Sequence, residues 1–233
     1  MKATRTVQIG RPRLSEEVAS YLRDEIMSGE LRPGQFIRLE DVAEVLGVSI
    51  TPVREALLTL SGEDMVQLEA RRGYVVAPLS RQDVDDLFRL QADLAGELAV
   101  RAAAVITDDE LDELGEVQHA LIKAVRANRP DDIERLESEF HRIINAAASA
   151  RKLSWFLRAA THYTPARFYA EDQGWRGAML DDHRELLEAM ARRDPAAVRS
   201  RMGRHFIDGA QRLIHHLDEI DFWAPDAPDA PGM

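Results

Sequence analysis

The chain has 233 residues, of which 45% are hydrophobic and 30% charged, and this length suits one or two globular domains. No apolar run approaches the roughly 20 residues that a membrane span needs, and the N-terminus lacks the apolar core of a signal peptide, so we expect no membrane partner. Cysteine is absent, which excludes disulfides and thiolate metal sites and is compatible with a cytoplasmic protein.

The formal net charge of −11 is unusual for a protein that binds nucleic acid. Its distribution is uneven, because residues 1–80 hold 10 Lys and Arg against 12 Asp and Glu, whereas residues 81–233 hold 20 against 29. The first part is therefore nearly neutral and the second strongly acidic. Any contact with DNA must come from a few locally placed arginines in the first part.

The first predicted element is a helix near the N-terminus. It follows a polar arm, residues 1–13, which we expect to be flexible. Ser15 can cap this helix, whose apolar residues recur at the 3.6-residue period and which ends near Gly29. The Leu-Arg-Pro-Gly sequence at 31–34 then predicts a turn.

Residues 42–57 have the pattern of a helix-turn-helix. Apolar residues within 42–46 form one helical stripe, and Gly47 lets the backbone leave that helix in a left-handed conformation. Ser49 can cap the next helix, and Pro52 then lies in its first turn, where the missing N–H costs little. The inward positions of this second helix follow helical spacing and are Val53, Ala56, Leu57 and Leu60.

The N-terminal end of that second helix leaves Ile50, Thr51 and Arg54 exposed. These are the positions that a recognition helix presents to base edges in the major groove of DNA. The segment therefore predicts a DNA-reading helix.

Two β-rich runs, residues 65–69 and 74–77, follow the second helix and flank a hairpin tip that carries Arg71 and Arg72. Helix, helix-turn-helix and hairpin together predict a winged helix. On composition alone Arg54, Arg71 and Arg72 could be solvated surface charges, but their positions on a recognition helix and a wing tip favour contacts with DNA. For Arg38, which lies before the helix-turn-helix, both interpretations stay open.

The second part of the chain is predicted to be an all-α antiparallel bundle. A short linker at 78–79 separates a winged helix-turn-helix domain, residues 1–78, from a helical effector-binding and dimerisation domain, residues 79–221. Helix starts are marked by Ser80 with Asp83, Thr107 with Glu110, Asp131 with Glu134, and Asp194 before Pro195. The predicted helices cover about 81–104, 108–127, 131–149, 152–170, 176–192 and 195–217. Residues 222–233, rich in Pro, Ala and Asp, predict a disordered tail.

Three of the seven histidines fall in a pattern that suits a metal site. Glu137 and His141 are four residues apart on one predicted helix, so both side chains project from one face. His183 and His205 each lie 11 residues from Asp194, which places them side by side in an antiparallel hairpin, about 16 Å from its turn. Nitrogen and oxygen ligands without sulfur suit Zn, Ni, Mn or Fe.

The alternative is that these histidines are hydrogen-bonded core residues without a metal, and spacing alone does not decide between the two. The remaining histidines have no such pattern and are predicted to be structural or exposed: His119, His162, His215 and His216.

The N-terminal part resembles the GntR superfamily of bacterial transcription regulators. The family's pattern of a turn glycine, Val-Ser and Thr-Pro-Val-Arg-Glu-Ala-Leu is present as Gly47, residues 48–49 and residues 51–57. The second part is similar to the FCD ligand-binding domain of the FadR-type branch. Its acid-x-x-Phe-His signature matches 137–141, and its later His-containing helices match 183–189 and 202–205.

The resemblance implies a metal set of Glu137, His141, His183 and His205, and operator contacts by Thr51, Pro52, Arg54 and Gly73. With the residues taken from the helix and the wing, the candidate DNA-binding set is Arg38, Ser49, Ile50, Thr51, Pro52, Arg54, Arg71, Arg72 and Gly73.

The chain departs from the family pattern at three places. Ile50 replaces a common arginine, which removes a guanine contact and leaves an apolar contact with a thymine methyl. Glu137 is one methylene longer than the usual Asp. In the first bundle helix, Gln91 and Ala95 stand where many relatives carry Arg and Glu.

These observations favour a homodimeric DNA-binding transcription regulator, and a repressor over an activator. The dimer would read a short inverted repeat in double-stranded DNA, since two-fold protein symmetry requires two-fold DNA symmetry. A small carboxylate effector would bind at or near the metal. Two alternatives stay open: a metal-dependent hydrolase or oxygenase built on the bundle, and a nucleic-acid binder whose bundle only dimerises.

Overall fold

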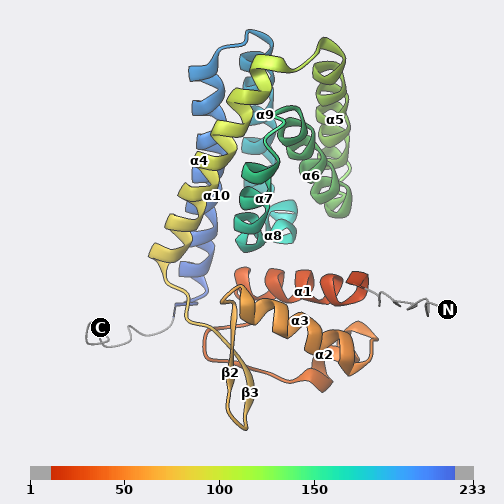
Figure 1. Cartoon of the computed structure of the whole chain (residues 1–233), viewed down its shortest axis with the longest axis vertical. Coiled ribbons are helices and arrows are strands. Elements are labelled where there is room, and N and C mark those ends of the chain that lie inside the picture. Colours follow the sequence, from red (N-terminus) through yellow and green to blue (C-terminus); the bar gives the residue numbers. More distant parts are fainter. Residues whose placement is uncertain (1–11, 224–233) are drawn as a thin grey trace, which may run out of the picture.

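The computed structural model describes residues 12–223, and Figure 1 shows a small N-terminal domain packed against one end of a larger helical bundle. The prediction of a mainly α protein, with a winged helix-turn-helix before an all-α bundle, is confirmed. Among the described residues, no helix combines the length and the apolar character that crossing a bilayer requires.

The N-terminal domain contains three helices and a three-stranded antiparallel sheet. Its elements are α1 (Pro12–Met27), β1 (Phe36–Ile37), α2 (Leu39–Leu46), α3 (Ile50–Gly62), β2 (Val66–Glu69) and β3 (Gly73–Val76). Gly47 ends α2 in the predicted left-handed conformation, with φ of 64°. The strand order is β1-β3-β2, so the predicted hairpin gains a third strand, β1, which was too short to be predicted from a periodic pattern.

The start of α1 differs from the prediction. The helix begins at Pro12, so Ser15 lies inside it, and the predicted arm 1–13 overlaps its first two residues. Proline favours a first helical position because its φ angle is already helical and its missing N–H would have no partner there. The rest of the predicted arm, residues 1–11, lies outside the described residues.

The bundle begins after the linker with two long, well-capped helices. Its elements are α4 (Arg81–Val105), α5 (Asp108–Arg126), α6 (Pro130–Ala147), α7 (Arg151–Ala160), the 3₁₀ turn η1 (Thr161–Tyr163), α8 (Ala166–Glu171), α9 (Gln173–Ala191) and α10 (Pro195–Glu219). The predicted capping boxes at Ser80 and Thr107 are present, and Asp194 accepts two backbone N–H groups at the start of α10. The predicted start at Asp131 is wrong, because Pro130 already occupies the first position of α6.

The helix predicted over 152–170 is also wrong, since this segment divides into α7, η1 and α8. Pro165 explains the break: a proline disfavours helical geometry in the residue before it, and Thr164 is extended, with φ of −104° and ψ of 111°. The next helix, α9, starts at Gln173, earlier than predicted, because the Asp172 side chain accepts the N–H of Trp175 at 2.6 Å.

One buried apolar cluster runs through both domains. It includes Leu22 of α1 and Leu57 of α3 together with Phe88 of α4 and Leu213 of α10. Figure 1 shows α4 and α10 side by side along the bundle, with their lower ends above the N-terminal domain. Phe222 belongs to the same cluster and is 2% exposed, so the predicted disordered tail starts too early; residues 224–233 lie outside the described residues.

The turn after α1 packs directly on the end of α10. Gly29 has a φ of +88°, and a Cβ atom there would lie 2.4 Å from Cδ1 of Ile220 and 3.2 Å from Phe222. The guanidinium group of Arg32 closes the same junction by donating to the carbonyl oxygens of Ile220, at 2.7 Å, and Asp221, at 3.0 Å.

We predict that Gly29→Ala lowers the free energy of unfolding more than Gly34→Ala, by about 1–3 kcal/mol, the usual cost of overpacking. Gly34 is the matched control, because its φ is +80° but, within the described structure and apart from its two chain neighbours, no atom lies within 4 Å of a Cβ there. Both variants therefore carry the left-handed strain, and only Gly29→Ala adds a clash. Urea unfolding monitored by circular dichroism measures both, and equal losses would contradict close packing at this junction.

Candidate DNA-binding surface and metal centre

Helix α3, the predicted recognition helix, buries one face and exposes the N-terminal end predicted to meet DNA. Its buried apolar residues are Val53, Ala56, Leu57 and Leu60. Ser49, Thr51 and Arg54 are exposed, and Ile50 is 38% exposed. Ser49 occupies the N-cap position, but its side chain makes no capping hydrogen bond, so its hydroxyl stays available to another partner.

Pro52 differs from its neighbours in the predicted DNA-binding set, because its side chain is buried in the first turn of α3. It fixes the backbone at the start of this helix, since its φ angle is restricted to helical values.

The wing places its two arginines in different environments. Arg71 lies at the hairpin tip, exposed and with a φ of +66°. Arg72 is held within the wing, because its guanidinium donates to Glu69 at 3.1 Å and lies 4.5 Å from the centre of the Phe36 ring. Gly73 has a φ of +101°, which favours glycine.

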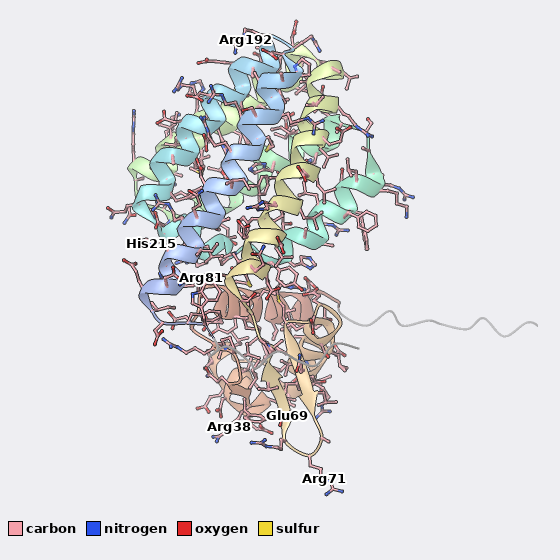
Figure 2. The ribbon with its side chains drawn as sticks, turned by 90° about the vertical axis from the view of Figure 1, so that its left-hand side faces the viewer. Arg38, Glu69, Arg71, Arg81, Arg192 and His215 are labelled. Atoms are coloured by element: carbon pink, nitrogen blue, oxygen red, sulfur yellow. The ribbon has the colours of Figure 1, made fainter. Side chains whose placement is uncertain are left out.

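Arg38 lies immediately before α2 and is exposed. Figure 2 shows Arg38, Glu69 and Arg71 at the end of the molecule farthest from the top of the bundle. The predicted cations Arg38 and Arg71 therefore share the end formed by the N-terminal domain.

The four predicted metal ligands meet inside the bundle. Glu137 and His141 come from α6, His183 from α9 and His205 from α10, and one ligand atom from each lies within 4.8 Å of the others. Oε1 of Glu137 is 3.3 Å from Nε2 of both His141 and His205, and Oε2 is 3.4 Å from Nε2 of His183. The i,i+4 spacing on α6 and the antiparallel α9–α10 pair thus produce the predicted cluster.

Neighbouring side chains hold the imidazole rings in place. The ring of His183 stacks on Phe140 at 3.8 Å with 5° between the planes. Its Nδ1 donates to Oε1 of Gln118 at 3.3 Å, while the amide nitrogen of Gln118 donates to the Leu180 carbonyl at 2.9 Å. Because the amide is oriented in this way, Nδ1 carries the proton and Nε2 directs a lone pair into the cluster.

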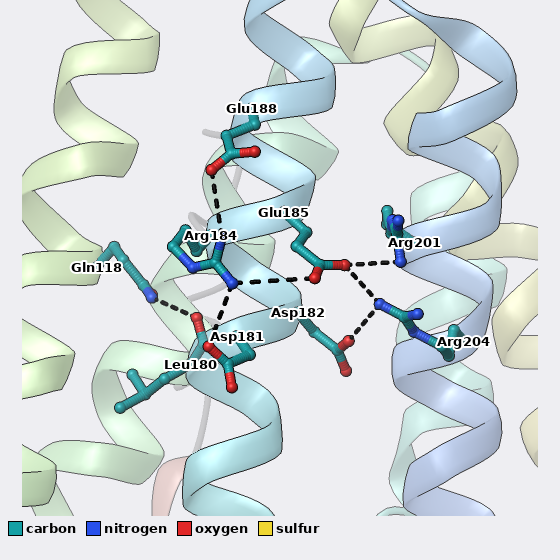
Figure 3. Close-up of polar contacts among 9 residues, drawn as sticks. All are labelled: Gln118, Leu180, Asp181, Asp182, Arg184, Glu185, Glu188, Arg201 and Arg204. Atoms are coloured by element: carbon teal, nitrogen blue, oxygen red, sulfur yellow. Dashed lines mark hydrogen bonds and ion pairs between the residues drawn. The ribbon is translucent and has the colours of Figure 1, made fainter.

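Asp182 lies beside His205 as Gln118 lies beside His183. Its carboxylate lies 3.6 Å from Nδ1 of His205 and accepts a hydrogen bond from Arg204 at 3.1 Å. Figure 3 shows that Arg204 contacts both Asp182 and Glu185, and that Gln118 reaches the backbone of α9. Gln118 and Asp182 were not predicted from the sequence, although the position of Asp182 next to His183 was a signal.

The electrostatics of the cluster favour an anionic carboxylate among the imidazoles. Burial opposes ionisation of Glu137, but the three imidazoles around it hold its pKa well below the usual range. Burial lowers the pKa of His183. Burial also opposes protonation of His205, yet the carboxylates of Asp182 and Glu137 raise its pKa to about 9.

The donor set fits a divalent cation. Oε2 of Glu137 and Nε2 of His183 are buried and have no hydrogen-bond partner among the described residues. Buried polar atoms normally have partners, and atoms that bind an ion are one recognised exception. Three imidazole nitrogens and a carboxylate are also typical ligands of first-row transition metals.

A cavity of about 1120 Å³ adjoins this cluster. Glu137, His141 and His205 line it, together with residues of α4, α7, η1, α8 and α9. Aromatic side chains of Phe88, Trp175 and Phe206, and cations of Arg142, Arg151 and Arg158, contribute to its wall. A cavity of this size and mixed lining suits a small organic ligand with an acidic group.

Gln91 and Ala95, the two residues of the first bundle helix that the sequence singled out, are both buried in α4. Gln91 is fully buried and donates to the carbonyl oxygen of Ala160, at 3.0 Å. Ala95 is buried in a second apolar cluster. Gln91 therefore connects α4 to the end of α7.

The other histidines are exposed or structural, as predicted. His119 and His215 are exposed, and Nε2 of His216 lies 3.0 Å from the carbonyl oxygen of Ser28. His162 has a partner that the sequence did not reveal, because its Nδ1 lies 3.0 Å from Oε1 of Glu63 in the N-terminal domain.

Both parts of the chain match known protein families. Residues 14–76 match the family described as bacterial regulatory proteins, gntR family, and residues 86–208 match the FCD domain.

Two relatives align with this chain over most of their length. The HTH-type transcriptional repressor RspR of Escherichia coli K12 is 26% identical over 215 residues, which cover 90% of this chain and 93% of the relative. The uncharacterized HTH-type transcriptional regulator YdhC of Bacillus subtilis 168 is 27% identical over 207 residues, covering 86% and 91%. The solved structure of E. coli McbR/YncC has the same fold, with a TM-score of 0.69, 22% identity, and coverage of 88% of this chain and 99% of that one.

Proposed function

The chain belongs to the GntR family of bacterial regulatory proteins and carries an FCD domain, and we propose that it is a homodimeric repressor controlled by a small organic acid. As a DNA-binding transcription regulator it is not an enzyme, so the hydrolase or oxygenase alternative is set aside. We place its action in the cytoplasm, where bacterial DNA is read.

The exposed N-terminal end of α3 carries the DNA-binding part of the proposal. Arg54 and Thr51 would contact base edges in the major groove, and Ile50 would contact a thymine methyl. Arg71, at the wing tip, would reach the adjacent phosphates or the minor groove. Two copies related by two-fold symmetry would then read an inverted repeat. A relative that is itself called a repressor, RspR, supports repression as the output.

The His/Glu cluster carries the effector part of the proposal. Glu137, His141, His183 and His205 would hold one divalent cation, and a donor set without sulfur suits Zn, Ni, Mn or Fe. When bound, the cation supplies positive charge that attracts a carboxylate. Arg151 and Arg158 would attract the same anion from the wall of the cavity, while its aromatic residues exclude water.

Control of DNA binding requires that the acid distinguish two arrangements of the protein. The acid would release DNA only if it binds the arrangement that cannot fit the operator more tightly than the one that can. The coupling free energy in such systems is about 1–3 kcal/mol, which changes operator affinity about 5- to 150-fold.

The proposal is tested by footprinting the wild-type protein on the DNA upstream of its own gene. We expect one protected inverted repeat, together with near one equivalent of metal per chain in protein purified without chelator. Uniform protection of the DNA would contradict the proposal that the protein reads a specific operator. If the protein protects the repeat but contains no metal and does not respond to acids, the bundle serves only for dimerisation.

We predict that Gln118→Ala weakens metal binding about 10- to 100-fold, since partners that orient a ligating histidine typically have this effect. The matched control is Gln82→Ala, because Gln82 pairs only with Asp86 on the surface of α4 within the described structure. Competition with a fluorescent zinc chelator measures both variants. Equal affinities for Gln118→Ala and Gln82→Ala would show that Gln118 does not orient His183 for a metal.

A further inference from the structure

The turn η1 lies between the cavity and the N-terminal domain. It follows α7, which forms one wall of the cavity, and its residue Thr161 lines that cavity, as does Thr164 just beyond it. Its other two residues, His162 and Tyr163, point to the N-terminal domain, where both contact Glu63. Figure 1 shows α7 and α8 directly above α1 and α3.

Glu63 is the residue that ends the recognition helix. Its carboxylate accepts hydrogen bonds from Nε and Nη2 of Arg23, at 2.7 and 2.8 Å, and lies 3.0 Å from Nδ1 of His162. Its backbone carbonyl accepts a hydrogen bond from the hydroxyl of Tyr163. The end of α3 is thus bound to α1 on one side and to η1 on the other.

Glu63 is ionised in this network. Burial alone would raise the pKa of its carboxyl, but hydrogen bonds and charges from His162 and Arg23 outweigh burial and lower it to about 2. Arg23 itself is only 6% exposed. A half-buried ionic network of this kind depends strongly on geometry, since a small displacement leaves charged groups without partners.

The bundle fixes both ends of the same turn through one residue. Gln91 donates to the carbonyl oxygen of Ala160, immediately before η1, and accepts a hydrogen bond of 3.0 Å from the hydroxyl of Thr164, immediately after it. A molecule that displaces Thr161 or Thr164 from the cavity side must therefore move the turn as a unit. Close-packed interiors transmit such displacements to their neighbours.

We propose that η1 transmits occupancy of the cavity to the recognition helix, through the contacts of His162 and Tyr163 with Glu63. This inference rests on the proposed effector-controlled function and specifies its route. The apolar junction of Gly29 with Ile220 holds the two domains together at a second place, so a shift of η1 changes the direction of α3 without separating the domains.

The test compares how one probe changes operator affinity in the wild type, Glu63→Gln and Tyr163→Phe. The probe is Zn²⁺ with one carboxylic acid, chosen from succinate, citrate, gluconate and benzoate as the one that raises Tm most. Fluorescence anisotropy measures operator affinity with and without the probe, and the thermal shift reports probe binding by each variant. Glu16→Gln is the matched control, because Glu16 also pairs with Arg23, at 2.9 Å, but lies on the exposed part of α1.

We expect the probe to change operator affinity at least about fivefold in the wild type and in Glu16→Gln, as is usual for coupled sites. In Glu63→Gln and Tyr163→Phe the thermal shift persists, but the change in operator affinity falls below about twofold. Tyr163→Phe removes a single hydroxyl, so the route can still be tested if Glu63→Gln does not fold.

Two results would overturn the inference, and they have different consequences for the proposed effector control. If the wild type responds to the probe and both variants respond equally, the route through η1 is wrong while effector control stands. If the wild type binds its operator but shows no response to any of the acids, effector control itself fails.

Discussion

Replacing Arg54 with alanine is expected to lower the affinity of the protein for its upstream DNA at least about tenfold. One arginine contact with a base edge contributes about 1–3 kcal/mol, and a dimer loses two of them. The loss should be larger on the inverted repeat than on unrelated DNA, because a base contact carries sequence information. Arg54 is exposed, so the fold should not change. Fluorescence anisotropy with both DNA molecules measures the effect.

The matched control for this experiment is Arg192→Ala. Arg192 is also an exposed arginine, but Figure 2 shows it at the opposite end of the molecule from Arg38 and Arg71. The control therefore makes the same change in net charge without touching the proposed DNA-binding surface. Equal DNA affinities for Arg54→Ala and Arg192→Ala would show that Arg54 does not contact DNA.

Replacing His183 with glutamine is expected to abolish tight metal binding. The imidazole is 1% exposed and supplies one of four donors, and glutamine retains volume but has no nitrogen lone pair. A ligand at about 1000 times its Kd stabilises a protein by about 4 kcal/mol, so the rise in Tm on adding Zn²⁺ should largely disappear. Elemental analysis and thermal unfolding measure the two effects.

His215→Gln is the control for the metal experiment. His215 lies on α10, as His205 does, but its side chain is exposed and pairs with Glu219 at 3.4 Å. This variant should keep near one equivalent of metal and the full rise in Tm. If the carefully purified wild type contains no metal and its Tm does not rise on adding Zn²⁺, these histidines are core residues and not metal ligands.

Local patterns explain why much of the fold and the site could be predicted. Gly47, Ser49 and the apolar spacing after them define the helix-turn-helix within about fifteen residues, and helical periodicity needs no distant partner. The cluster was predicted for a related reason. Glu137 and His141 are one helical turn apart, and the turn at Asp194 makes the heights of His183 and His205 on their two helices comparable.

Contacts between distant segments explain most of what was missed. Tyr163 and Glu63 are 100 residues apart in the sequence, and no periodic pattern connects them. The role of Gln118 likewise depends on how α5 packs against α9. The break at Pro165 is different, because its signal was present in the sequence and only its effect on Thr164 was overlooked.

The most direct test of effector control is the operator affinity of the wild-type protein in three states: with chelator, with Zn²⁺, and with Zn²⁺ plus each carboxylic acid in turn. We predict that at least one acid weakens binding about fivefold or more, and only when the metal is present. The same affinity in all three states, for a protein that still protects its inverted repeat, would contradict it.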